Sequence, residues 1–420
     1  MPRNRLAQTL ILLCGLLSAG ATASSTASAA GELAGLQSDF ARQLTLAGPY
    51  DGAYVYDITA RQPLVSQRAT TLRPPASVEK LYTATAALAR MGPTARLSTT
   101  VLGTGRLEAA SGVWEGNLYL RGGGDPTFGS SSFIRAHYGG QGASVSALAS
   151  QLVRYGIHRI TGSVLGDESY LDSLRGEPSS GYAPDPFLEG TLSGLAFNRG
   201  ATGSERGPHA PAAYAARQLW ATLKNDGVSI AGRSGTAVTP AGASQLAQVS
   251  SPTMTTLLGL TLPPSDNFFA ETLVKNLGAR YAGSGTTAAG ASVVRQTLAS
   301  LLGIHPQVVD GSGLSPSDRT SPYHVADLLV EIASTSIGPV LRASLAIAGH
   351  TGTLATRMRH TAASGRCQGK TGTLTGVSNL VGYCTAANGH TLAYAIFTDG
   401  LSTSVAHRFQ DHMTITIANY

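Results

Sequence analysis

The sequence has few cysteines, and it lacks three patterns that would each indicate a particular class of protein. Only three of the 420 residues are cysteine, and the ten histidines show no paired spacing on one helical face, so we expect neither a metal centre nor a cofactor. No cluster of Lys and Arg interleaved with aromatic residues is present, which argues against nucleic-acid binding. A Gly-x-Ser-x-Gly sequence is also missing, which argues against an α/β-hydrolase triad.

Long apolar runs are equally scarce. The run at residues 10–17 follows Arg3 and Arg5, and it is too short for a membrane anchor. Small residues suited to cleavage follow it, so we predict a signal peptide over residues 1–30, removed together with Cys14. We therefore expect an exported protein of the periplasm or cell wall with no transmembrane anchor. The formal charge of +6 and a pI near 9.3 favour contact with acidic envelope polymers or membrane surfaces.

The two remaining cysteines flank a predicted hairpin. Strand-like residues lie on both sides of Thr375-Gly376, which suits a two-residue turn. With that turn Leu374 faces Val377, and counting outward along both strands brings Cys367 opposite Cys384. Facing cysteines are close enough for a disulfide in an oxidising compartment, which we predict. The alternative is two unpaired buried cysteines.

The chain alternates between helical and strand-like segments, and the character of these segments changes twice. From about residue 96 to residue 254, short alternating runs predict a β-rich region. Helical patterns dominate on both sides of that region. Helices are predicted at residues 31–47, 144–155, 211–226, 268–277 and 323–334; strands are predicted at residues 52–57, 63–65, 97–103, 116–121, 159–166 and 392–397. Residues 172–211 are rich in Gly, Pro and Ser and predict surface loops.

Ser77 and Lys80 precede a segment rich in alanine and leucine, residues 81–90, which favours a helix. Pro74 and Pro75 suit the first positions of that helix. Three residues make about one helical turn, so Lys80 is expected on the same face as Ser77. A partly desolvated lysine can take the proton of a serine hydroxyl, although such pairs also occur by chance on surface helices.

Two later segments carry further polar groups. Ser265-Asp266-Asn267 opens a segment in which Phe269, Leu273 and Leu277 form an apolar stripe at helical spacing. Lys370-Thr371-Gly372-Thr373 begins the first strand of the predicted hairpin.

Together the three motifs resemble those of serine β-lactamases and penicillin-binding proteins. With residues 123–127 and 310–315, they resemble the low-molecular-mass (class C) penicillin-binding proteins of the D-alanyl-D-alanine carboxypeptidase/endopeptidase family, which carry a large insertion between the first two motifs. The resemblance covers about residues 33–420. It implies an α/β fold: a three-layer α/β/α serine β-lactamase/transpeptidase-like catalytic domain from residues 31–95 and 255–420, with a large β-rich inserted region at residues 96–254.

The resemblance implies a serine-type D-Ala-D-Ala carboxypeptidase and leaves endopeptidase action on cross-links open. Ser77 is then the nucleophile that forms the acyl-enzyme, and Lys80 is its base. Repulsion from Lys370 is expected to lower the pKa of Lys80. Ser265 and Asn267 are expected to pass the proton towards the leaving amine and to hold the peptide.

The resemblance also implies how substrate is held. Lys370 and the hydroxyl of Thr371 are expected to bind the terminal carboxylate, and Gly372 to let the substrate lie close along the strand edge. The N–H groups of Ser77 and Thr373 are expected to form the oxyanion hole. The partners implied are peptidoglycan stem peptides ending in D-Ala-D-Ala, and β-lactams that imitate them.

Six acidic residues lie in or near these segments. Asp266 suits either a helix N-terminal acid or a catalytic acid, and Glu79 is expected to be a solvated helix residue. Asp125 and Asp310 are interpreted as turn formers. In the family an acidic residue of the insertion contacts the amine of the third substrate residue, and Asp185 and Glu189 lie where that residue falls.

Two other functions are compatible with the motifs. A serine β-lactamase needs a water positioned for rapid deacylation, and no Glu-x-x-x-Asn element is recognisable for it. A non-catalytic wall-binding or β-lactam-sensing module on the same fold would not need all of Ser77, Lys80, Ser265, Asn267 and Lys370.

Overall fold

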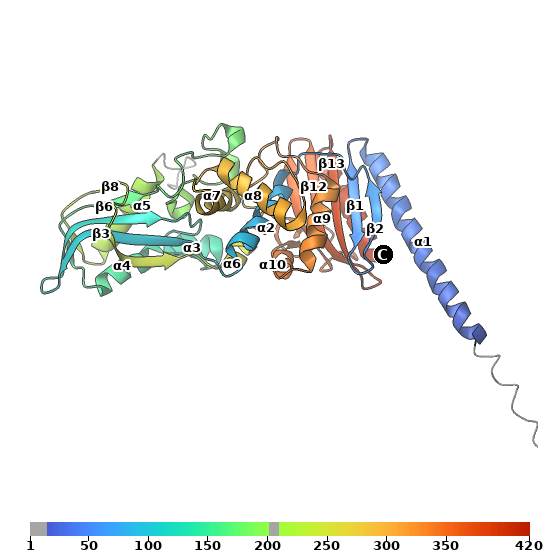
Figure 1. Ribbon diagram of the computed structural model, residues 1–420, viewed down its shortest axis with the longest axis horizontal. Helices are drawn as coiled ribbons and strands as arrows, with labels where there is room; N and C mark the ends of the chain where they lie inside the picture. Colours follow the sequence, from blue (N-terminus) through green and yellow to red (C-terminus); the bar gives the residue numbers. More distant parts are fainter. Residues whose placement is uncertain (1–14, 201–209) are drawn as a thin grey trace, which may run out of the picture.

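The computed structural model describes residues 15–200 and 210–420 (Figure 1). Part of the predicted signal peptide, residues 1–14 with Cys14, therefore lies outside the described residues. The first helix, α1, spans Gly15–Ala47 and so begins well before the helix predicted at residues 31–47. Among residues 15–200 and 210–420, no helix combines the length and apolar character needed to cross a membrane.

A six-stranded antiparallel sheet forms the centre of the first unit, in the order β10-β11-β12-β13-β1-β2. Its strands come from both ends of the chain, because the N-terminal β1 pairs with the late strand β13. The strands are β1 (Gly52–Asp57), β2 (Gln62–Gln67), β10 (Ala346–Ile347), β11 (Cys367–Leu374), β12 (Val377–Thr385) and β13 (Thr391–Asp399).

Helices cover both faces of this sheet, which makes the three layers predicted (Figure 1). On one face Leu36, Phe40 and Leu44 of α1 pack with α11 (Thr403–Asn419). On the other face the apolar stripe Phe269, Leu273 and Leu277 is fully buried, as predicted. The helices of this face are α2 (Lys80–Met91), α6 (Met254–Thr261), α7 (Asn267–Tyr281), α8 (Thr287–Leu302), α9 (Pro322–Ala333) and α10 (Gly338–Ala343).

A second sheet of seven strands is built wholly from residues 98–250, inside the predicted insertion. Its strands are β3 (Ser98–Glu108), β4 (Val113–Gly122), β5 (Arg159–Ile160), β6 (Val164–Asp167), β7 (Ser229–Ile230), β8 (Ser234–Thr236) and β9 (Ser244–Ser250). Its helices are α3 (Ser131–Tyr138), α4 (Val145–Arg154) and α5 (Pro211–Asn225). The strand predicted at residues 159–166 is two strands, because the side chain of Asn117 accepts from the Ser163 N–H between them at 2.8 Å. The division of the chain into domains at these boundaries stays a prediction.

The segment predicted as surface loop, residues 172–211, contains the short 3-10 turns η2 (Pro178–Ser180), η3 (Pro186–Leu188) and η4 (Phe197–Gly200), with residues 201–209 outside the described part. The predicted hairpin has the expected register, with Leu374 opposite Val377 and Cys367 opposite Cys384. The two cysteines form the predicted disulfide.

Candidate active site

Ser77 lies in a 3-10 turn, η1 (Ala76–Glu79), which leads directly into α2 at Lys80. The first turn is therefore tighter than the α-helix that we predicted, but a spacing of three residues still stacks Ser77 and Lys80 on one face. Lys80 Nζ lies 2.9 Å from Ser77 Oγ. Ala76 has a φ of 50°, a backbone conformation that alanine rarely adopts, so the residue before the serine is strained.

The Lys80 amine meets three oxygen atoms. Besides Ser77 Oγ, these are Asn267 Oδ1 at 2.6 Å and the Ser312 carbonyl at 2.7 Å. The amide and carbonyl oxygens can only accept hydrogen bonds. A neutral amine has two N–H groups and one lone pair, so these two oxygens occupy both N–H groups. The lone pair is then left for the Ser77 hydroxyl, which is the arrangement that a general base needs.

Burial lowers the pKa of Lys80 to about 8, while the charges of Asp310, Glu271 and two further acidic residues act in the opposite direction. Repulsion by Lys370, the cause that we predicted, is not what lowers the Lys80 pKa. The repulsion instead affects the pKa of Lys370. Burial, and then the charge of Lys80, hold the pKa of Lys370 well below the usual range.

Lys370 on β11 forms a second hydrogen-bonded group, with Ser265. Its Nζ donates to Ser265 Oγ at 2.7 Å and to the Thr371 carbonyl at 2.7 Å. Ser265 has a φ of 68°, so it too holds an unusual backbone conformation. Asn267 is the first residue of α7, and its Oδ1 is the acceptor of Lys80. All five predicted catalytic side chains therefore take part in two short hydrogen-bonded groups, Ser77–Lys80–Asn267 and Lys370–Ser265.

The residues after Lys370 differ in how they are placed. The Thr371 hydroxyl is nearly buried and donates to Thr353 Oγ1 at 2.8 Å, whereas Thr373 is exposed at the strand edge. A Cβ at Gly372 would lie 2.5 Å from the Pro75 carbonyl. The glycine thus lets β11 lie against the residues that precede Ser77, a reason that sequence reasoning missed; close approach of substrate there stays a prediction.

The loop with Asp185 and Glu189 reaches the site through its backbone. Asn267 Nδ2 donates to the Phe187 carbonyl at 2.7 Å. The Asp185 carboxylate accepts from the Phe187 N–H at 2.7 Å and so caps η3. The exposed Glu189 lies 3.4 Å from Arg199. Both predicted substrate contacts therefore lie beside the site, but their role towards substrate stays a prediction.

Glu79 is not the solvated residue that we predicted. Its side chain is fully buried, and neither carboxylate oxygen has a hydrogen-bond partner. Burial, followed by repulsion from Asp318, Asp310 and Glu271, raises the pKa of Glu79 well above its usual value and so favours the neutral acid. The prediction was wrong because this helix has no solvated face here: every residue of α2 from Lys80 to Leu88 is buried, and so is most of the turn before it.

The interpretation of Asp310 as a turn former is confirmed, and its loop has a further use. Asp310 accepts from the Gly313 N–H at 2.6 Å and the Ser315 N–H at 2.7 Å. Glu271 Oε1 accepts from the Ser312 N–H at 2.8 Å. These bonds fix the Ser312 carbonyl at Lys80. Sequence reasoning missed the contacts of Glu271 and of Ser312, although Ser312 lies in the family-like segment 310–315. Neither a backbone acceptor nor a residue in the middle of a helix reveals its partner in the sequence.

Asp125 and Asp266 both form bonds typical of turns and helix starts. The Asp125 carboxylate accepts from the Thr127 N–H at 2.8 Å, which confirms the interpretation as a turn former. Asp266 is the N-cap of α7, accepting from the Phe269 N–H at 2.9 Å, and this favours the helix-terminus interpretation. It also pairs with Arg199 of the insertion, which the sequence did not indicate.

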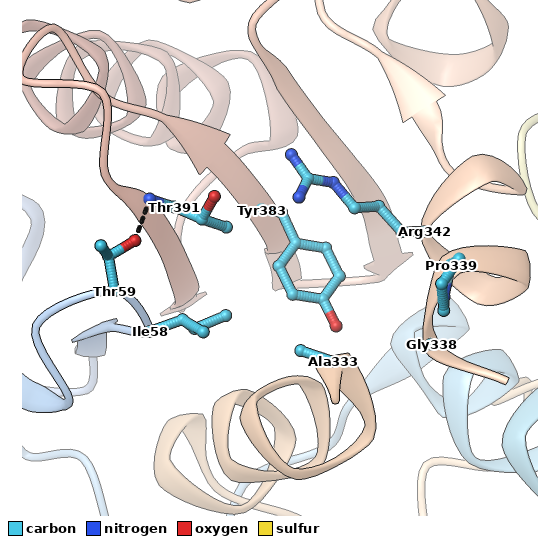
Figure 2. Close-up of a pocket in the computed structure, with 8 residues that line it drawn as sticks. All are labelled: Ile58, Thr59, Ala333, Gly338, Pro339, Arg342, Tyr383 and Thr391. Atoms are coloured by element: carbon cyan, nitrogen blue, oxygen red, sulfur yellow. Dashed lines mark hydrogen bonds between the residues drawn. The ribbon is translucent and has the colours of Figure 1, made fainter. Parts of the chain in front are cut away.

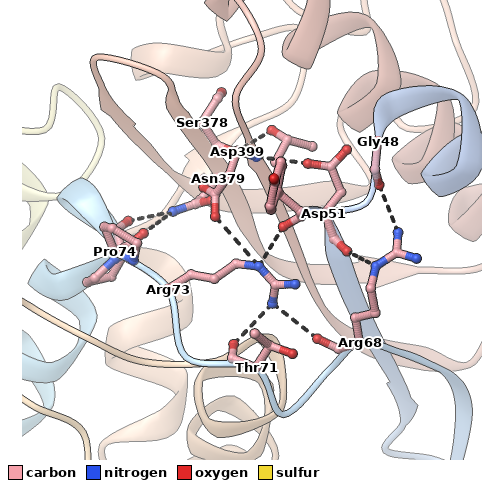
Figure 3. Close-up of polar contacts among 12 residues, drawn as sticks. Gly48, Asp51, Arg68, Thr71, Arg73, Pro74, Ser378, Asn379 and Asp399 are labelled. Atoms are coloured by element: carbon pink, nitrogen blue, oxygen red, sulfur yellow. Dashed lines mark hydrogen bonds and ion pairs between the residues drawn. The ribbon is translucent and has the colours of Figure 1, made fainter.

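The segment before Ser77 is anchored to the central sheet (Figure 3). Asn379 of β12 donates to the carbonyls of Pro74 at 3.0 Å and Pro75 at 2.9 Å. The buried Arg73 donates to the Tyr50 carbonyl at 2.7 Å and lies 3.6 Å from Asp399. The strained backbone at Ala76, directly before Ser77, is therefore restrained by the hydrogen bonds from β12 and by the contacts of Arg73.

A cavity of about 340 Å³ elsewhere in the same unit contains none of the motif residues (Figure 2). It is lined by Ile58, Thr59, Ala333, Gly338, Pro339, Arg342, Tyr383 and Thr391. Arg342, its charged group, lies over the Tyr383 ring at 5.2 Å and donates to Gln368 at 3.2 Å, so its contacts are accounted for by the fold. Within the described part of the chain, no three His, Cys, Asp or Glu side chains gather as metal ligands.

The chain matches the model of the D-Ala-D-Ala carboxypeptidase 3 (S13) family over residues 35–185 and 191–420. It is 28% identical to a D-alanyl-D-alanine carboxypeptidase of Actinomadura sp. (strain R39), covering 89% of this chain and 82% of that protein. It is 29% identical to a carboxypeptidase of Mycobacterium tuberculosis, covering 77% of this chain and 71% of that protein.

Among solved structures, penicillin binding protein 4 from Haemophilus influenzae has the same fold. The TM-score is 0.77 at 20% identity, with 91% of this chain and 99% of that chain covered. A second structure of that protein, complexed with a β-lactam, matches with a TM-score of 0.68 at 21% identity and the same coverage.

Proposed function

Since this chain belongs to the D-Ala-D-Ala carboxypeptidase 3 (S13) family, and as a member is a serine-type D-Ala-D-Ala carboxypeptidase, we propose that Ser77 is its nucleophile. The substrate is a peptidoglycan stem peptide, and the bond cleaved joins its two terminal D-alanines. The observation that carries the proposal is the set of contacts around Lys80, which leaves the amine lone pair for Ser77.

In the first step Lys80 takes the Ser77 proton while Oγ attacks the carbonyl carbon of the penultimate D-alanine. The N–H groups of Ser77 and Thr373 stabilise the resulting oxyanion, at roughly 3 kcal/mol per donor. The C–N bond then breaks. The Ser265 hydroxyl gives its proton to the leaving amine and takes up the proton that Lys80 accepted, so Lys80 is neutral again and D-alanine departs.

In the second step Lys80 takes a proton from the water that attacks the acyl carbonyl. The bond from that carbonyl carbon to Ser77 Oγ then breaks, and Lys80 returns the proton to Oγ, which restores Ser77. Lys370 binds the substrate's terminal carboxylate together with the Thr371 hydroxyl, whose hydrogen turns from Thr353 Oγ1 to the carboxylate. Burial lowers the pKa of the Lys370 amine in the free enzyme, whereas an arriving carboxylate favours the charged form, so the substrate strengthens the ion pair that binds it.

The same chemistry accounts for β-lactams as inhibitors. Their strained amide presents a carbonyl to Ser77 and a carboxylate to Lys370, and ring opening leaves no departing group to make room for water. We propose an exported enzyme at the cell wall, where stem peptides are found. Asp185 and Glu189 remain the candidate contacts for the third substrate residue.

The test is release of D-alanine from a stem pentapeptide by the exported protein and by Ser77→Ala. We expect complete loss in Ser77→Ala and full activity in Ser111→Ala, an exposed serine in the turn between β3 and β4. Equal release by Ser77→Ala would reject the nucleophile.

Two further measurements separate the neighbouring activities. A cross-linked stem-peptide dimer offered in parallel measures endopeptidase action. The lifetime of a fluorescent penicillin label on Ser77 distinguishes the alternatives, because a β-lactamase loses the label rapidly whereas the proposed enzyme keeps it.

A further inference from the structure

Arg199 of the insertion forms an ion pair with Asp266, the middle residue of the Ser265-Asp266-Asn267 segment. Arg199 Nη1 lies 2.5 Å from Asp266 Oδ2, and Nη2 lies 3.0 Å from Oδ1. Both side chains are close to nine-tenths buried, at 12% and 11% exposed. The guanidinium also lies over the rings of Phe268 and Phe269, at 5.0 and 5.7 Å. This is a two-bond pair of fixed geometry in a largely dry place, unlike an exposed surface ion pair.

Asp266 stands between two residues that contact the catalytic lysines. Ser265 before it accepts from Lys370, and Asn267 after it accepts from Lys80. Ser265 holds its strained φ of 68° only if neighbouring bonds impose it. Asp266 supplies two of these bonds, because its N–H donates to the Thr261 carbonyl at 2.9 Å and its side chain is held by Arg199.

The other side of Arg199 is fixed within the insertion. Its Nε donates to the Glu189 carbonyl at 2.7 Å, and its own carbonyl accepts from the Thr191 N–H at 2.9 Å. Asn267 completes a second link, from its Nδ2 to the Phe187 carbonyl. The start of α7 and the loop at residues 185–189 are thus tied together twice, once through Arg199.

We propose that Arg199 is a positioning residue for the reaction: acting through Asp266, it holds Ser265 and Asn267 where they meet Lys370 and Lys80. The inference rests on the proposed function, because it assumes that these two contacts serve acylation of Ser77. It makes the insertion a part of the catalytic machinery as well as a flanking domain.

The charge of the pair adds a second consequence. The carboxyl groups whose charges act on Lys80 are Glu79 beside it, Asp266 at the N-cap of α7, Glu271 of α7 and Asp310 of the following loop. Lys370 of β11 is the nearby cation, and burial, followed by the charge of Lys80, lowers its pKa. Asp266 favours the charged form of Lys80, and Arg199 offsets Asp266. Removing Arg199 alone therefore raises the pKa of Lys80, whereas removing the Asp266 charge lowers it.

The test measures the second-order rate of Ser77 acylation by fluorescent penicillin across pH, for Arg199→Gln, Arg199→Lys, Asp266→Asn and the double variant Arg199→Gln/Asp266→Asn. We expect Arg199→Gln to acylate ~10- to 100-fold more slowly, since small misplacements of catalytic groups cost this much. The acylation rate of Arg199→Lys should lie between those of the wild type and Arg199→Gln, because lysine keeps the charge but cannot form two parallel hydrogen bonds. The double variant should lose no more than the worse single variant, because both act through one contact.

The pH profile separates positioning from a merely structural role. The acid limb of the acylation rate should move to higher pH in Arg199→Gln and to lower pH in Asp266→Asn, which keeps a side-chain oxygen to cap α7. The matched control is Arg175→Gln, which removes an equivalent two-bond pair with Glu168 inside the insertion, at 2.7 and 2.8 Å. It should leave both the rate and the limb unchanged, whatever its effect on melting temperature.

Two results overturn the proposal: wild-type acylation rate in Arg199→Gln, or an unmoved acid limb in both single variants. If Arg199→Gln does not fold, Arg199→Lys and Asp266→Asn decide by the same criteria. Peptide mapping of the penicillin label keeps the two proposals apart. A label on a residue other than Ser77 rejects the nucleophile, whereas a label on Ser77 at unchanged rate in the variants rejects only the role of Arg199.

Discussion

At the scale of single residues, the site depends on one amine in a crowded and dry position. Lys80 is 1% exposed, and its pKa of about 8 leaves a sizeable neutral fraction near physiological pH. The neutral form is the one whose two N–H groups match Asn267 Oδ1 and the Ser312 carbonyl. In the proposed mechanism burial thus prepares Lys80 to act as the base, while the surrounding carboxyl groups keep its pKa from falling further.

We therefore predict that acylation of Ser77 by penicillin rises about tenfold per pH unit below pH ~8 and levels off above it, because only neutral Lys80 accepts the proton. Lys80→Arg keeps a cation that does not deprotonate, and it should acylate ~10²- to 10⁴-fold more slowly with no such rise. Stopped-flow acylation between pH 5.5 and 9.5 measures both. A flat wild-type profile would contradict the role of Lys80 as the base.

Glu79 leads to a prediction about stability. Because its pKa is raised in the folded state, the unfolded chain releases this proton at lower pH than the folded protein does. The group therefore destabilises the fold increasingly as pH rises above about 4.5, its value in the unfolded chain. Glu79→Gln should melt at a higher temperature than the wild type at pH 8 and at nearly the same temperature at pH 5.

Calorimetry at the two pH values measures this difference. A difference of equal size at both would show that Gln acts through packing and that Glu79 does not titrate. The expected difference would make Glu79 an ionisable group that costs stability near the functional site.

At the scale of elements, the site is the meeting of strand β11 with the turn η1. The Asn379 side chain of β12 donates to the carbonyls of Pro74 and Pro75. Gly372 of β11 has no Cβ, so the Pro75 carbonyl can lie against the strand. The sequence predicted the strand, the hairpin and its disulfide, because alternation and turn residues are local signals. It did not predict a 3-10 turn at Ser77, because the contacts that tighten it come from β11 and β12.

Gly372→Ala is predicted to lower stability by about 1–3 kcal/mol, because its Cβ would overlap the Pro75 carbonyl and push η1 from the strand. Acylation of Ser77 by penicillin should also be slower in Gly372→Ala than in the wild type. The matched control is Gly376→Asn at the tip of the same hairpin, where a Cβ meets nothing within 4 Å and asparagine tolerates the positive φ. Urea unfolding and penicillin acylation check both variants; an unimpaired Gly372→Ala would contradict the packing role.

At the scale of the whole molecule, the insertion and the helices around the site share buried polar contacts. Lys275 of α7 is 1% exposed and pairs at 2.5 Å with Asp172, which lies in the loop region of the insertion. Asn276 donates to the Gly124 carbonyl at 2.9 Å. Together with the Arg199–Asp266 pair, these contacts tie α7 to the insertion along its length.

Asp172→Ala should therefore cost about 3–5 kcal/mol, since it leaves the Lys275 charge buried without a counter-charge and with only the Leu174 carbonyl as acceptor. The double variant Asp172→Ala/Lys275→Met should regain part of that loss, because the unpaired charge is gone. Asp226→Ala, at an exposed helix end, is the control and should stay within about 0.5 kcal/mol of wild type. Denaturant unfolding of the wild type and the three variants measures the free energies of unfolding. An equal loss of stability in Asp172→Ala and in the double variant would contradict the prediction that the unpaired charge is the cause.

The sequence by itself determined the three motifs and the hairpin with its disulfide, because spacing and periodicity are properties of neighbouring residues. The three-layer fold followed from the family resemblance that those motifs carry. Only the tertiary structure decided that Ser312 and Asn267 would face Lys80, that Glu79 would be buried, and that Arg199 would hold Asp266. These contacts join segments far apart in the chain. They depend on packing between elements, which leaves no regular pattern along the sequence.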